Sequence, residues 1–73
     1  MILKKEDYKK ERWTEVLKII IEETKKADFI YTEFPPEEFV HWVIKQEKYD
    51  WRGSLSIFSD EEPNAWRLSI KEK

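Results

Sequence analysis

Hydrophobic residues between positions 5 and 26 recur at spacings of three and four, which places them along one side of a helix. The pattern predicts a helix over residues 5–26. Lys25 and Lys26 then stand at its carboxyl end, where the helix dipole favours cations. The positions that share the apolar side are Trp13, Val16, Leu17, Ile20 and Thr24.

A short run rich in β-branched and aromatic residues follows over Asp28–Phe34 and predicts a strand. Alternate positions place Phe29 and Tyr31 on one face and Ile30, Thr32 and Phe34 on the opposite face. Both faces are partly apolar, so the alternation leaves open which of them is buried.

Two prolines mark the end of this strand and the start of a second helix. Pro35-Pro36 suits a first helical turn, because the missing N–H has no helical partner there. Glu37 and Glu38 follow at the positive end of the helix dipole, which favours carboxylates. We expect this helix to end near Glu47. Its apolar side is Phe39, Val40, Trp42, Val43 and Ile44.

The last third of the chain alternates between apolar and polar residues, which is typical of half-buried strands. Residues 60–64 lie between the two alternating runs and are rich in turn-forming residues. The runs are therefore expected to pair as an antiparallel hairpin. The apolar positions are Tyr49, Trp51, Gly53, Leu55 and Ile57 in the first run and Trp66, Leu68 and Ile70 in the second.

The predicted order of elements is α-β-α-β-β. Each element has an apolar side that needs a partner, so we predict an α+β fold in which two helices pack on one face of a small three-stranded, antiparallel-type sheet. A length of 73 residues fits a single domain over residues 1–73.

Composition narrows the class of protein. The chain has no cysteine, so it can form neither a disulfide nor a thiolate metal site. Its net charge of −2 is not the strong positive field of a nucleic-acid binder. No apolar run approaches the ~20 residues of a membrane span, and the N-terminus lacks a signal peptide's hydrophobic stretch. We therefore expect a cytoplasmic protein with no membrane contact. The Lys and Glu content also fits a thermophile or a designed protein.

His41 is the single histidine, and Glu38 and Glu37 precede it by three and four positions on the second predicted helix. Such a pair can begin a metal or acid–base site, but a metal site needs three or four ligands. A solvated pair on the helix surface is the favoured interpretation. One glycine excludes a glycine-rich phosphate cradle, and no serine stands at a strand-to-helix elbow. We expect no catalytic residue, no metal, no cofactor and no enzyme activity.

The outward face of the predicted hairpin combines cations with a phenylalanine. This face can stack bases and bind phosphates. It can equally bind a protein, since arginine and aromatic side chains are typical interface anchors, or remain a solvated sheet face. The negative net charge disfavours nucleic acid. The residues concerned are Arg52, Phe58, Arg67 and Lys71.

Several short segments occur in a suggestive order. Ile20–Thr24 ends the first predicted helix, Phe29–Glu33 follows as a strand, and Pro36–Val40 opens the second helix. Phe58–Asp60 then turns into Trp66–Ile70. This order, over about half of the chain, resembles the uracil-DNA glycosylase inhibitors of bacteriophages.

The chain departs from this family at several points. The family uses a Glu-Ser-Ile stretch on its first strand to mimic DNA, whereas this chain has Tyr31-Thr32-Glu33-Phe34 there. About one strand of the family's sheet is missing between Lys48 and Leu55, and this chain is less acidic than the family. The resemblance implies a small inhibitor of a host enzyme, with Glu33, Glu37 and Glu38 as interface candidates by position.

The sequence thus predicts a non-catalytic protein-binding module, in its narrower form a phage or mobile-element inhibitor of a host nucleic-acid enzyme or defence complex. Two alternatives stay open: a small nucleic-acid-binding protein that uses the Arg and aromatic hairpin face, and a designed protein without biological function. An unprotected strand edge also allows a homodimer. The partner-binding candidates are Glu33, Glu37, Glu38, Arg52, Phe58, Arg67 and Lys71.

Overall fold

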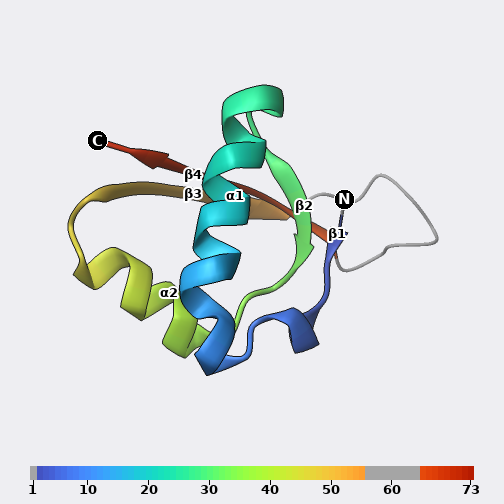
Figure 1. Ribbon diagram of the computed structural model, residues 1–73. Helices are drawn as coiled ribbons and strands as arrows, with labels where there is room; N and C mark the ends of the chain where they lie inside the picture. Colours follow the sequence, from blue (N-terminus) through green and yellow to red (C-terminus); the bar gives the residue numbers. More distant parts are fainter. Residues whose placement is uncertain (1, 56–64) are drawn as a thin grey trace.

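Four strands of the described residues form one sheet, and both α-helices lie over one face of it (Figure 1). The buried side chains of the helices form one core with that face. The computed structural model describes residues 2–55 and 65–73. The arrangement confirms the predicted α+β fold. The elements are β1 (Ile2–Leu3), two 3₁₀ turns (Lys5–Asp7 and Lys10–Arg12), α1 (Trp13–Ala27), β2 (Ile30–Glu33), α2 (Glu37–Lys45), β3 (Tyr49–Leu55) and β4 (Ala65–Glu72).

β4 lies between β2 and β3 and pairs antiparallel with both. Leu68 stands opposite Ile30 of β2, and Ile70 stands opposite Trp51 of β3. This register places the apolar positions of the three strands on one face, as the alternation predicts. The three-stranded antiparallel sheet and its C-terminal hairpin are therefore confirmed, while the predicted turn at residues 60–64 lies outside the described residues.

β1 is a short addition that the sequence did not predict. Ile2 and Leu3 pair in parallel with Tyr31 and Thr32 of β2. Two residues are too few to show an alternation, so no pattern in the sequence reveals this strand. The side chain of Leu3 is buried in the core, which ties the N-terminus to the sheet.

The first helix begins at Trp13, so the prediction that it starts at residue 5 is wrong. Tyr8 and Trp13 are both buried in the core. In one continuous helix, side chains five positions apart point about 140° away from each other. The chain instead turns between them, and the indole N–H of Trp13 donates a hydrogen bond to the Tyr8 carbonyl at 3.0 Å. Because both rings are buried, the residues predicted to form the first turns of the helix form the two 3₁₀ turns instead.

Both helices end next to a residue in the left-handed backbone region. Asp28, with a φ of 68°, follows α1, and Glu47, with a φ of 58°, lies two residues after the end of α2. A positive φ cannot continue a right-handed helix, and Asp tolerates it better than most residues. α2 ends at Lys45 and Gln46 keeps helical backbone angles, so the chain leaves the helical conformation at the predicted position, near Glu47.

Phe39 of α2 occupies the centre of the core and is fully buried. Its ring lies 5.0 Å from the Tyr8 ring and 5.7 Å from the Trp13 ring, measured between centroids. On the sheet side the Trp51 ring lies 6.3 Å away. This one side chain therefore joins α2 to the N-terminal segment, to α1 and to β3.

The structure shows which face of β2 is buried, a question that the alternation in the sequence left open. Ile30 and Thr32 point into the core, with exposed fractions of 7% and 0%. Phe29 and Tyr31 alternate with them on the opposite face and are half-buried. Thr32 is tolerated inside because its hydroxyl forms hydrogen bonds to the Tyr8 hydroxyl at 2.5 Å and to the Glu33 carbonyl at 2.7 Å.

The buried Tyr8 hydroxyl predicts a loss of stability at alkaline pH. Burial is the largest effect on this phenol and raises its pKa from 10.0 to about 12. The hydrogen bond with Thr32 lowers the pKa, and the nearby Asp7 charge raises it. The unfolded chain therefore releases this proton first as the pH rises. Below pH 10 the neutral phenol contributes fully to stability, and its contribution is lost as the pH rises through 12, by about 2–3 kcal/mol.

Urea unfolding of the wild type and of Tyr8→Phe, below pH 10 and near pH 12, checks this expectation. The variant lacks the titrating group, so its stability should fall less over the same interval. All other residues are common to the two proteins, so their contributions cancel in the comparison. Equal losses in the two proteins would contradict the assignment of Tyr8.

Candidate binding surface on the uncovered sheet face

The face of the sheet opposite the helices carries cations beside aromatic rings. In the strand register Arg67 lies opposite Tyr31, and Arg52 lies opposite Ser69. These positions have the opposite parity to Leu68 and Ile70, which lie in the core. We call this surface the uncovered sheet face; its described members are Phe29, Tyr31, Asp50, Arg52, Arg67, Ser69 and Lys71.

Three of the predicted hairpin candidates are brought together here. Arg52, Arg67 and Lys71 come from the neighbouring strands β3 and β4, and all three are exposed. Phe58, the fourth candidate, lies outside the described residues. The sequence did not propose Phe29 or Tyr31 for this surface, although the structure places them beside Arg67.

A shallow hollow of about 230 Å³ forms the centre of the uncovered sheet face. Its walls are the two arginines, 52 and 67, together with the Phe29 ring. The guanidinium carbon of Arg67 lies 5.2 Å from the centroid of that ring, within the range of a cation–π contact. Phe29 is in turn held edge-on against Tyr31, with centroids 5.4 Å apart. The ring contacts order the arginine without removing it from solvent.

Carboxylates balance the remaining cations of this face. The Arg52 Nε lies 3.6 Å from an Asp50 oxygen, and the Lys71 Nζ lies 4.0 Å from an Asp28 oxygen. All four side chains are more than half exposed, so each pair contributes little to stability. The carboxylates of these two pairs keep the net positive charge of the uncovered sheet face small.

The acidic candidates lie elsewhere, where the strand β2 gives way to α2. Glu33 and Glu37 border a second hollow of about 420 Å³, together with the Pro35-Pro36 turn and Trp66. Glu38 belongs to the neighbouring side of α2, beside His41. The three glutamates therefore do not form one cluster: Glu37 and Glu38 belong to α2, whereas Glu33 shares the strand parity of Tyr31 at the end of β2.

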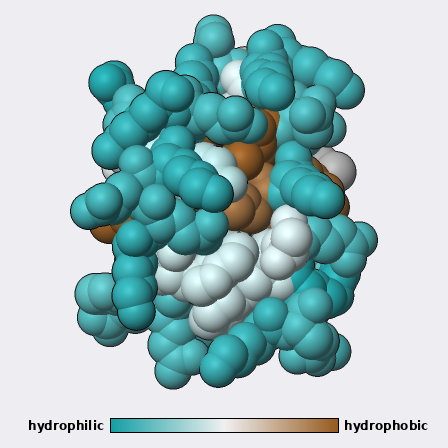
Figure 2. Space-filling view, turned by 60° about the vertical axis from the view of Figure 1, so that its left-hand side comes forward, coloured by the Kyte–Doolittle hydropathy of each residue, from teal (hydrophilic) through white to brown (hydrophobic). Residues whose placement is uncertain are grey.

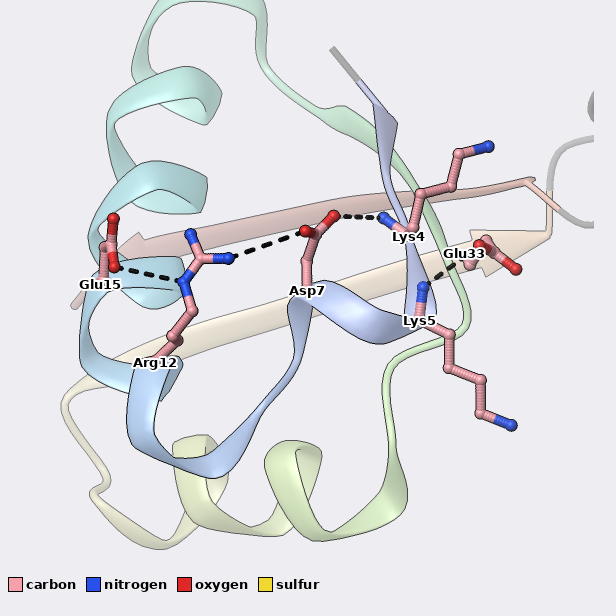
Figure 3. A network of polar contacts seen from close by, with 6 residues as sticks. All are labelled: Lys4, Lys5, Asp7, Arg12, Glu15 and Glu33. Atoms are coloured by element: carbon pink, nitrogen blue, oxygen red, sulfur yellow. Dashed lines mark hydrogen bonds and ion pairs between the residues drawn. The ribbon is translucent and has the colours of Figure 1, made fainter.

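Glu33 already has a structural role. Its carboxylate accepts a hydrogen bond from the Lys5 backbone N–H at 3.1 Å, which fastens the N-terminal segment to β2 (Figure 3). In the same region Asp7 accepts the Lys4 N–H at 2.8 Å and lies 3.8 Å from Arg12. The network stabilises the first 3₁₀ turn, so the Glu33 carboxylate is partly used inside the fold.

His41 forms the solvated helix-surface pair that the sequence favoured. Its Nε2 lies 3.4 Å from a Glu37 oxygen, and the two side chains are 74% and 86% exposed. Within residues 2–55 and 65–73, no group of three or more His, Cys, Asp or Glu side chains is placed to hold a metal ion. The pair therefore lies on the solvated surface of α2.

A groove of about 440 Å³ lies between α1, the C-terminal end of α2 and the start of β3. Figure 2 shows hydrophobic side chains exposed on this side of the molecule, with hydrophilic residues around them. Leu17 and Ile21 lie along the groove but are only 5% and 7% exposed. Trp42 and Tyr49 are half-buried beside it. The groove is thus a shallow depression on the surface above the core, and Lys18 and Glu22 line it as well.

Comparison with known proteins found no matching family model, no matching curated protein and no matching solved structure. The resemblance to the phage inhibitors therefore stays a prediction. Among the helices of the described residues, none is long and apolar enough to cross a membrane. The fold and the surface define a small α+β domain in which the helices cover one face of the sheet, while no described element covers the opposite face, which carries arginine and aromatic side chains.

Proposed function

We propose that this chain is a non-catalytic binding module that docks a protein partner on the uncovered sheet face. The observation that carries the proposal is the central hollow, which is lined by Arg52, Arg67 and the Phe29 ring. Arginine and aromatic side chains are enriched among the residues that dominate binding energy at protein interfaces. A hollow between them can accept a protruding side chain from the partner.

The charge pattern favours a protein over nucleic acid. The affinity of a protein for a phosphate backbone comes largely from cations that are not already neutralised by carboxylates of the protein itself. Here Asp50 pairs with Arg52 and Asp28 pairs with Lys71, so carboxylates repeat along the same surface. A protein partner can match such a mixed pattern with its own acids and bases, and this matching sets orientation and specificity. We further place the module in the cytoplasm, in keeping with its lack of cysteine.

The binding experiment compares two double variants with equal charge change. Arg52→Glu/Arg67→Glu reverses the proposed surface, whereas Lys18→Glu/Lys26→Glu reverses two exposed positions on α1. A partner captured by the wild-type protein is purified and its affinity is measured for all three forms. Loss of two interface arginines is expected to weaken binding about 30-fold or more, and the α1 variant should bind like the wild type. Equal affinities of the two variants would remove the uncovered sheet face as the docking surface.

Nucleic acid is tested in parallel with labelled single-stranded and duplex oligonucleotides at low salt. The proposal expects no binding that depends on the two arginines. Binding that weakens steeply with salt and is lost in Arg52→Glu/Arg67→Glu would favour the nucleic-acid alternative instead.

The narrower proposal, inhibition of a host nucleic-acid enzyme, draws support from a different surface. Glu37 and Glu38 are exposed at the first turn of α2 and can stand in for phosphates toward a basic groove. Uracil-DNA glycosylase is the first enzyme to assay, given the resemblance of segment order. We expect stoichiometric inhibition that is weakened in Glu37→Gln/Glu38→Gln. Full enzyme activity with an excess of the protein would remove this target.

A further inference from the structure

β3 forms a long outer edge of the sheet. The other outer strand, β1, has two residues, whereas β3 has seven. Edges that natural proteins protect carry proline, a bulge or charged side chains, above all lysine, or are very short; the charges of β3 are Asp50 and Arg52. The β3 sequence, Tyr49–Leu55, contains neither proline nor lysine, and its pairing with β4 runs without a bulge. Within residues 2–55 and 65–73 no strand pairs with this edge, so we treat it as available to another strand.

The pairing with β4 fixes which backbone groups point outward along this edge. The Lys73 N–H donates to the Lys48 carbonyl at 3.0 Å, and these residues continue the β3–β4 register. In an antiparallel ladder hydrogen-bonded and non-hydrogen-bonded pairs alternate. Asp50 and Arg52 therefore bond to β4, while the N–H and C=O groups at positions 49, 51 and 53 point away from the sheet.

We propose that a second copy of this chain pairs with β3 in antiparallel fashion, with Trp51 opposite Trp51 on the two-fold axis. Tyr49 then lies opposite Gly53 of the other copy, so all the outward backbone groups at these positions meet partners. On the uncovered sheet face Asp50 of each copy lies opposite Arg52 of the other. Opposite charges in this arrangement stabilise a sheet.

Charge complementarity selects this register over its neighbours. The nearest alternative registers that still pair the outward backbone N–H and C=O groups place the two-fold axis at Asp50 or at Arg52 instead of Trp51. The first register sets two carboxylates directly opposite each other, and the second sets two guanidinium groups opposite each other. Like charges in that position destabilise a sheet. The sequence Asp50-Trp51-Arg52 is thus self-complementary about its central residue.

Gly53 supports the same register. A Cβ at this position would meet its nearest neighbours at 3.5–3.8 Å, which is ordinary contact, and the residue does not have a positive φ. Glycine in the middle of a strand costs about 0.5–1 kcal/mol relative to alanine, and the single subunit gives no steric reason for it. In the proposed dimer the Tyr49 ring of the other copy covers this position, as aromatic residues do opposite glycines in sheets.

The dimer joins two four-stranded sheets into one, with the helices on the same side. The two uncovered sheet faces then form one continuous surface, and Arg52 and Arg67 of both copies lie near its centre. This inference does not depend on a protein partner, because the edge and the register are properties of β3 alone.

Charge variants test the dimer and its register together. Asp50→Arg gives two cations on the edge and Arg52→Asp gives two anions, so each variant alone should self-associate about tenfold or more weakly than the wild type. An equimolar mixture of the two should form a heterodimer, because every facing pair is again of opposite charge. Sedimentation equilibrium over a concentration series measures all four samples, and circular dichroism verifies that each variant is folded. A wild-type protein that stays monomeric over the whole series would overturn the proposal.

Disulfide trapping gives a second measure, helped by the absence of native cysteine. Positions 50 and 52 of different copies form a non-hydrogen-bonded pair, with Cα atoms about 4.5 Å apart, which suits a disulfide. A mixture of Asp50→Cys and Arg52→Cys should therefore oxidise mainly to the mixed dimer. Positions 50 and 50 are offset by two residues along the strands and lie about 8 Å apart, beyond disulfide range. Equal yields of same-variant and mixed disulfides would overturn the register.

Discussion

Replacing Phe39 with alanine is expected to lower the free energy of unfolding by about 3–5 kcal/mol. The ring is fully buried and contacts Tyr8, Trp13 and Trp51, which come from three separate parts of the chain. A domain of this length has a total stability of only about 4–11 kcal/mol. The substitution should therefore remove a large part of the stability and leave the domain partly or wholly unfolded at room temperature.

Urea unfolding followed by circular dichroism measures this effect, with Ile44→Ala as the matched control. Ile44 lies on the same helix but is 53% exposed. Its replacement should change stability by less than about 1 kcal/mol, because little buried area is lost. If the two midpoints fall by similar amounts, Phe39 is not the centre of the core.

Replacing Ile70 with alanine is expected to cost about 2–5 kcal/mol. Its side chain is fully buried, lies opposite Trp51 and belongs to the face of β4 that the helices cover. The Ile70 carbonyl also accepts a hydrogen bond from the Thr24 hydroxyl of α1 at 2.9 Å. The backbone bond survives the substitution, so the loss should come from packing alone.

Lys71→Ala is the control for Ile70, since it is the next residue on the same strand and points to the opposite face. Its ion pair with Asp28 is exposed and spans 4.0 Å, so its removal should change stability by no more than about 0.5 kcal/mol. A large loss in Lys71→Ala with a small loss in Ile70→Ala would mean that the register of β4 is shifted by one residue.

The strongly periodic parts of the fold were predictable from the sequence. Residues 13–27 keep a helical stripe long enough to identify α1, and alternation identifies both strands of the C-terminal hairpin. The N-terminal segment was not predictable in this way. β1 has two residues, and the turns before α1 follow from the burial of Tyr8, which no local pattern encodes.

The candidate surface was predictable only in part. Strand parity alone places Arg52, Arg67 and Lys71 together, because a period of two holds wherever a strand forms. Phe29 and Tyr31 were missed because both faces of their strand are partly apolar, and the choice between them depends on how β2 packs. Glu33 was named from a resemblance, but its bond to the Lys5 N–H joins positions far apart in sequence.

The helices cover one face of the sheet, and no described element packs on the arginine face, which we propose as the docking surface. Thiol-labelling rates of Arg67→Cys and Leu68→Cys test this arrangement most directly, because these neighbouring residues point to opposite faces and the chain has no other cysteine. The expected result is labelling at position 67 at nearly the rate seen in denaturant, with labelling at position 68 slowed by orders of magnitude. Rapid labelling at both positions, or protection of position 67 alone, would contradict the account.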